Sequence, residues 1–69
     1  MDNYTKYKLA KEIMSRAMAI ACSNGFNPND PVIAELIYEE RELRRFNESV
    51  IDKILTVYAP LVSAGDING

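Results

Sequence analysis

Histidine and tryptophan are absent from this 69-residue chain, and cysteine occurs once, at Cys22. Without histidine, the chain has neither a histidine base nor a cysteine–histidine pair for nucleophilic catalysis. A single cysteine cannot form an internal disulfide, and one cysteine without histidine does not make a zinc-type ligand set. We therefore expect a protein that is not an enzyme and that holds neither a cofactor nor a metal ion.

Long apolar runs are also missing from the sequence. No stretch approaches the ~20 apolar residues that a membrane-spanning helix needs. The segment MDNYTKYKLAKEIM mixes acidic and basic residues, and it lacks the apolar core and cleavage site of a signal peptide. The unpaired thiol of Cys22 is typical of a reducing compartment. These features predict a cytoplasmic protein with no membrane partner.

Charge is divided unevenly along the chain. Residues 1–24 hold four basic and two acidic residues, a net charge of +2, whereas residues 25–69 hold four basic and eight acidic residues, a net charge of −4. Such polarity can orient two copies of the chain head to tail. The basic residues do not cluster as they do in nucleic-acid-binding proteins, so a nucleic-acid partner is not expected.

Apolar residues recur at helical spacing over residues 4–22, with polar residues on the opposite arc of the helix. The pattern predicts an amphipathic helix capped by Asn3 or Thr5. Ala10, Ala17 and Ala21 form a row of small side chains that lets another helix approach closely. The apolar positions are Tyr7, Leu9, Ala10, Ile13, Met14, Ala17, Met18, Ile20 and Ala21.

Turn-forming residues fill the segment SNGFNPND, residues 23–30. Asn24 and Gly25 suit the left-handed conformation that ends a helix, and Asp30 followed by Pro31 is a typical helix start. A phosphate-binding loop needs a preceding strand, more glycines and a lysine after the last of them. We interpret the segment as a connection between helices, and we expect Phe26 to close the end of the core beneath it.

Two arrangements are compatible with the second half of the chain. The apolar face continues without a change of phase, and RRFNESV contains neither glycine nor proline, which favours one helix over about residues 31–59, kinked or broken near Asn47. Asn47 is also a good N-cap, which favours a three-helix bundle. Pro60 is expected to end the helix. We thus predict an all-α helical hairpin with a three-helix bundle as the alternative, in a single domain over residues 1–62 with a flexible tail at 63–69.

The continuous helix would extend beyond its partner. It would be about 43 Å long against about 28 Å for the first helix, at ~1.5 Å per residue. The overhang would expose Ile54, Leu55, Val57 and Tyr58, and a monomer rarely exposes so large an apolar surface. Tyr38 projects from the polar side of its helix and is a candidate interface anchor. These five residues are the predicted partner-binding residues.

Two carboxylates lie within the apolar arc, Glu39 and Glu40. Acidic residues in such a position are candidates for a raised pKa or for metal binding. The favoured interpretation is that Glu40 pairs with Arg44 one turn later, and that Glu39 lies at the edge of the apolar stripe.

The favoured function is a small non-enzymatic module that binds a partner protein and self-associates as a homodimer. A chain of this length buries only roughly 60% of its unfolded surface, so help from a partner is plausible. The alternative is a dimeric DNA-binding transcriptional regulator, whose binding to DNA would weaken with rising salt. A phosphatase that uses Glu39 or Glu40 is the third hypothesis.

Overall fold

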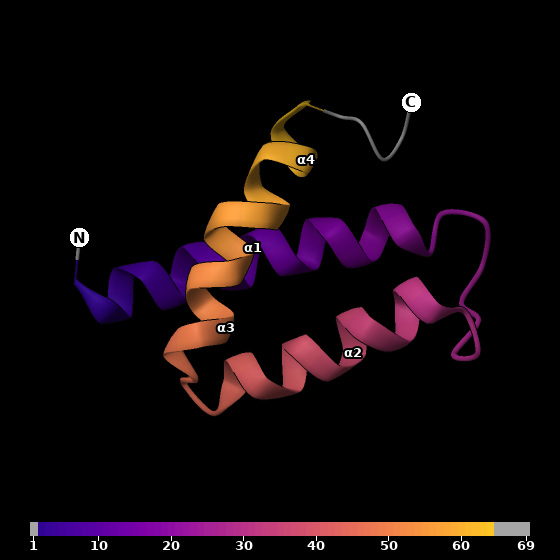
Figure 1. The fold of residues 1–69 in the computed structure, drawn as a ribbon. Helices are drawn as coiled ribbons and strands as arrows, with labels where there is room; N and C mark the ends of the chain where they lie inside the picture. Colours follow the sequence, from indigo (N-terminus) through magenta and orange to yellow (C-terminus); the bar gives the residue numbers. More distant parts are fainter. Residues whose placement is uncertain (1, 65–69) are drawn as a thin grey trace.

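A computed structural model describes residues 2–64, and these residues are mostly helical and include no strand, which confirms the all-α prediction. The elements are α1 (Asn3–Ala21), α2 (Pro31–Arg44), α3 (Glu48–Lys53), the π-helical turn η1 (Ile54–Tyr58) and α4 (Ala59–Ala64). The last three form one uninterrupted helix over residues 48–64, which we call the third helix. Figure 1 shows α1 and α2 side by side as a hairpin, with the third helix crossing them.

Helix α1 begins one residue earlier than the sequence suggested. The carboxylate of Asp2 accepts a hydrogen bond from the backbone N–H of Thr5 at 2.7 Å, so Asp2 is the N-cap. The expectation of a cap at Asn3 or Thr5 was wrong, because both residues lie inside the first turn of the helix.

The connection between α1 and α2 follows the prediction at Asp30 but not at Gly25. Helix α1 ends at Ala21 with Cys22 as its C-cap, three residues before Gly25, so Asn24 and Gly25 lie within the connection and do not cap the helix. Gly25 has φ = +116°, the left-handed conformation that favours glycine.

Asp30 caps α2 by accepting hydrogen bonds from the N–H groups of Val32 at 2.8 Å and Ile33 at 3.5 Å, and Pro31 occupies the first helical position. Phe26 does not close the core as expected, because its side chain is exposed to solvent.

The chain reverses direction between α2 and α3, so the three-helix alternative applies. Phe46 has φ = +56°, its N–H bonds to the carbonyl of Leu43, and the N–H of Asn47 bonds to the carbonyl of Glu42. These two bonds make a Schellman motif, in which glycine usually occupies the left-handed position. Asn47 then caps α3 through Ser49 N–H and Val50 N–H.

The third helix also continues past Pro60, where we expected it to end. In the preceding π-helical turn, the N–H of Ala59 bonds to the carbonyl of Ile54, five residues back. Pro60 lies inside this helix, directly after the π-helical turn, where the local hydrogen-bonding pattern already departs from that of an α-helix. Of the predicted tail, residues 63–64 belong to α4, and residues 65–69 lie outside the described residues.

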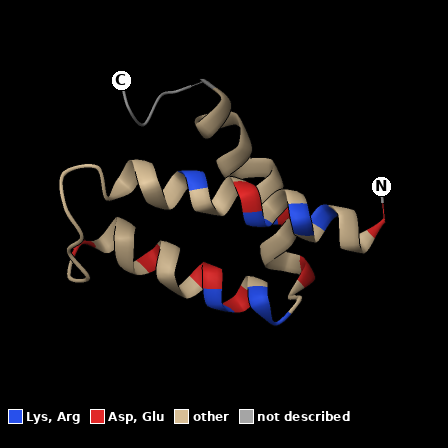
Figure 2. Ribbon diagram, turned by 180° about the vertical axis from the view of Figure 1, so that it is seen from behind, with Lys and Arg blue, Asp and Glu red and all other residues tan. Residues whose placement is uncertain are grey.

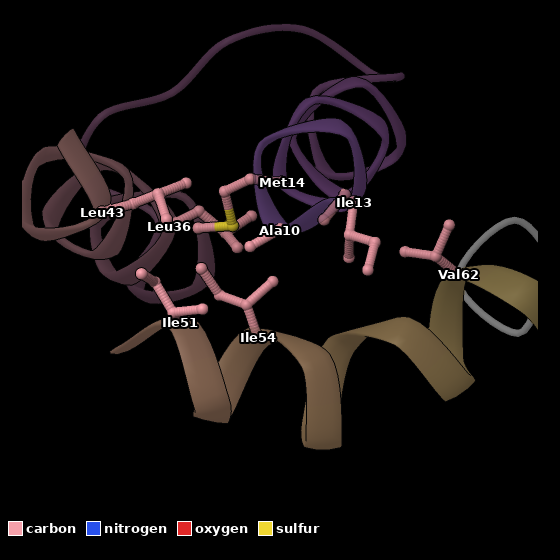
Figure 3. Close-up of a cluster of buried hydrophobic side chains, with 9 residues drawn as sticks. Ala10, Ile13, Met14, Leu36, Leu43, Ile51, Ile54 and Val62 are labelled. Atoms are coloured by element: carbon pink, nitrogen blue, oxygen red, sulfur yellow. The ribbon is translucent and has the colours of Figure 1, made fainter. Parts of the chain in front are cut away.

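The core lies where the third helix crosses the hairpin, and all three helices contribute to it. Ala10 and Ala17 are buried, as their spacing predicted, and they let the other helices approach α1 closely. Figure 3 shows Leu36, Leu43, Ile51 and Ile54 gathered around Met14, with Ile13 and Val62 to one side. The buried cluster consists of Ala10, Ile13, Met14, Ala17, Leu36, Leu43, Ile51, Ile54 and Val62. The expected overhang of residues 54–58 does not exist, because the third helix folds back onto the hairpin.

Candidate functional site

The five predicted partner-binding residues lie in different environments. Ile54 is 0% exposed, and Leu55 and Tyr58 are partly buried against the core, so these three side chains pack within the chain. Val57 and Tyr38 are exposed, on η1 and α2 respectively. The structure therefore does not bring the five together on one surface, and only Val57 and Tyr38 are largely available to a partner.

Glu39 is the buried charged residue of the described chain, with 2% of its surface exposed. One carboxylate oxygen accepts a hydrogen bond from the phenolic hydroxyl of Tyr58, and the other forms an ion pair with the ammonium group of Lys53. The three residues come from α2, α3 and η1. This network ties the third helix to α2, because it satisfies a carboxylate that burial would otherwise destabilise.

The network changes the protonation behaviour of both partners. Burial raises the pKa of the Tyr58 phenol, and its hydrogen bond to Glu39 raises that pKa further. The hydrogen bond to Glu39 likewise raises the pKa of Lys53. The Lys53 ammonium also lies 6.0 Å from the centroid of the Tyr58 ring. The arrangement favours a charged Lys53 and a neutral Tyr58, which are the forms that donate hydrogen bonds to the carboxylate.

The sequence-based interpretation of the two glutamates was right for one of them. Glu40 pairs with Arg44 at 3.4 Å, as predicted. Glu39 is not at the edge of the apolar stripe but inside the fold, since the third helix covers it. Both oxygens of Glu39 are occupied by side chains of the same protein. Residues 2–64 contain no group of three acidic or cysteine side chains placed to hold a metal ion.

The pH dependence of stability tests the network when Tyr58 is replaced by phenylalanine. Both raised pKa values lie above the ordinary values of 10.0 for tyrosine and 10.5 for lysine, so the folded state keeps protons that the unfolded chain releases. The free energy of unfolding should fall as pH rises above about 10. Denaturant titrations at about pH 9 and about pH 11 measure this fall in the free energy of unfolding. The fall between the two pH values should be smaller for Tyr58→Phe than for the wild type. Tyr38→Phe, at an exposed tyrosine, should keep the wild-type fall, and equal falls in all three proteins would contradict the network.

An apolar groove opens beside this network, at the loop end of the hairpin. Figure 1 shows the third helix crossing α1 near its middle, so the loop end is not covered. The groove has a volume of about 430 Å³ and is bounded by α1, α2, η1 and α4. Ile33 and Leu36 are buried in it, whereas Val32 and Leu61 are exposed along its edges. Its apolar lining residues are Ala17, Ile20, Ala21, Val32, Ile33, Leu36, Tyr58 and Leu61.

Charged side chains are concentrated at the other end of the molecule. All eight basic residues fall within residues 6–16 and 41–53. None falls within residues 17–38 or 54–64, the two ranges that contain the groove-lining residues. Figure 2 shows this separation along the hairpin. At the charged end, Arg45 pairs with Glu42 at 3.7 Å, so basic and acidic groups are interleaved there. That mixture is unlike the uniformly basic surface of a nucleic-acid-binding protein.

Comparisons of the chain with known protein families, with curated proteins and with solved structures find no match. Across residues 2–64, no helix is both long enough and apolar enough to cross a membrane.

Sequence reasoning missed the groove because its residues were assigned to one continuous buried face. Val32 and Leu61 both fit the helical stripe, yet each remains exposed, since the third helix turns away from the loop end. The signal present in the sequence was the absence of basic residues over 17–38 and 54–64, two segments that the fold brings together.

Proposed function

We propose that this chain is a non-enzymatic, cytoplasmic protein-interaction module that binds a partner protein through the groove at the loop end of the hairpin. The observation that carries the proposal is the apolar lining of the groove, in which Val32 and Leu61 are exposed. Exposed apolar surfaces next to a concave groove are typical of protein-binding sites.

We do not extend the proposal to a homodimer. The argument for self-association was that Ile54 and Tyr58 needed a second chain, and both side chains now have partners within the same chain.

Quantitative affinity capture from the source cells tests the proposal. The groove variant combines Val32→Gln with Leu61→Gln, at side chains that are 61% and 38% exposed. The matched control combines Tyr4→Gln with Leu9→Gln, at side chains that are 62% and 38% exposed on α1. Glutamine is a good helix former, so both variants should fold, as circular dichroism would verify.

The groove variant should retain its specific partner at about one tenth of the wild-type level or less, because it loses two apolar anchors worth roughly 1 kcal/mol each. The control variant should retain the partner at the wild-type level, as measured by mass spectrometry. Equal capture by all three proteins would show that the groove is not the binding surface.

A further inference from the structure

The groove has acidic residues at its border and no basic ones. Within residues 17–38 the charged residues are Asp30 and Glu35, and residues 54–64 carry no charge. Asp30 lines the groove. Glu35 is exposed on α2, next to Leu36 and three residues after Val32, both of which line the groove. Neither acid takes part in a salt bridge within the described part of the chain.

The arrangement of apolar residues in the groove suits a bound α-helix. Its lining comes from three helical walls, namely the end of α1, the start of α2 and the third helix. Ile33 and Leu36, one helical turn apart, lie at its base, and Val32 and Leu61 stand at its edges. A helix bound in such a groove inserts apolar residues spaced by three or four positions, while its polar residues face the rim.

We infer that the groove binds an amphipathic α-helix of another protein, whose apolar face is flanked by lysine or arginine residues. The inference rests on the proposed function and adds the chemical class of the partner. The apolar face replaces solvent over the groove lining, and the basic flanks face Asp30 and Glu35. Complementary charge at the rim selects for such helices and against helices with acidic flanks.

A second copy of this chain does not meet these requirements. Its basic helix α1 turns its apolar face into its own core. The large hydrophobic residues that α1 leaves exposed are Tyr4 and Leu9, which are five positions apart and thus about 140° apart around the helix. They cannot enter one groove together. The exposed Val57 and Leu61 of the third helix are four positions apart, but residues 54–64 contain no basic residue to face the acidic rim, so the occupant comes from a different protein.

Two synthetic helical peptides provide the probe. Both carry leucine at positions i, i+3, i+4 and i+7, and they differ only in having lysine or glutamate at the flanking positions. Fluorescence anisotropy should show the lysine peptide binding the full chain at least about tenfold more tightly than the glutamate peptide at low salt. The difference should shrink as added salt screens the exposed charges.

A charge-neutral variant distinguishes the contribution of the acidic rim to peptide binding from that of the apolar lining. Asp30→Asn combined with Glu35→Gln removes both charges, and asparagine preserves the helix cap. This variant should lower the preference for the lysine peptide by about threefold to tenfold, since exposed ion pairs contribute little individually. The Val32→Gln and Leu61→Gln variant should weaken binding of both peptides.

The outcomes distinguish this inference from the proposed function. Equal affinity for the two peptides, or no binding of either one, would overturn the inference of a basic amphipathic helix. Either result would leave the affinity-capture experiment to decide whether the groove binds a protein at all. Loss of partner capture in the groove variant, together with equal peptide affinities, would keep the proposed function and reject only the chemistry assigned to the partner.

Discussion

Replacing Ile54 with glutamate is expected to unfold the protein. The side chain of Ile54 is 0% exposed and packs among the buried residues of all three helices (Figure 3). A carboxylate there would have no counter-ion and would be desolvated, which costs several kcal/mol. A domain of this size has a total stability of only about 3–10 kcal/mol. Far-ultraviolet circular dichroism should therefore show loss of most helical signal and no cooperative thermal transition.

The neighbouring Val57 supplies the matched control. It lies in the same π-helical turn, but its side chain is exposed. Val57→Glu should remain folded, with a melting temperature within a few degrees of the wild type, because exposed substitutions usually change stability by less than about 0.5 kcal/mol. A folded monomer produced by Ile54→Glu from a wild-type dimer would contradict the three-helix fold. It would instead indicate that Ile54 packs between two chains.

Local sequence signals predicted the parts of the fold that depend on local geometry. Helical spacing predicted the hairpin, and Asp30 predicted the start of α2, because N-capping depends on a few adjacent residues. The Glu40–Arg44 pair followed from its spacing of four residues. These features need no knowledge of how the helices cross.

The break after α2 was harder to predict because the residue in the left-handed position is Phe46. Glycine is the usual residue there, and its absence favoured a continuous helix. The ring of Phe46 stacks on Tyr7 of α1, with ring centroids 4.4 Å apart. This contact between distant parts of the chain offsets a backbone conformation that is unfavourable for a bulky residue. This tertiary contact, which a local pattern does not contain, thus supports the turn at Phe46, just after the end of α2.

The candidate site depends on the same crossing of helices. Burial of Glu39 follows from the third helix lying over α2, and the groove follows from that helix leaving the loop end uncovered. Neither the position nor the angle of the crossing is encoded by helical periodicity. Asn47 gave a sequence signal for the reversal that creates both features, since its side chain caps α3.

Substituting the partly exposed Lys53 is expected to destabilise the protein more than substituting the buried Glu39. Lys53→Met leaves the Glu39 carboxylate inside the fold without its counter-ion. Removing one member of a buried pair is costly because an uncompensated charge remains. Glu39→Met instead removes the charge and leaves apolar atoms in its place. It should cost only about 1–2 kcal/mol, mainly through the lost acceptor of the Tyr58 hydroxyl.

The double substitution completes the comparison. Once Glu39 is methionine, the Lys53 side chain has no carboxylate to neutralise and can extend into solvent, so Lys53→Met should add almost nothing. Urea titrations of the wild type, both single variants and the double variant give the coupling energy between the two residues. A Lys53→Met variant less destabilised than Glu39→Met would mean that the carboxylate reaches water. The ion pair would then behave as a surface pair of little energetic value, and the hydrogen bond from Tyr58 would be the main link between the third helix and α2.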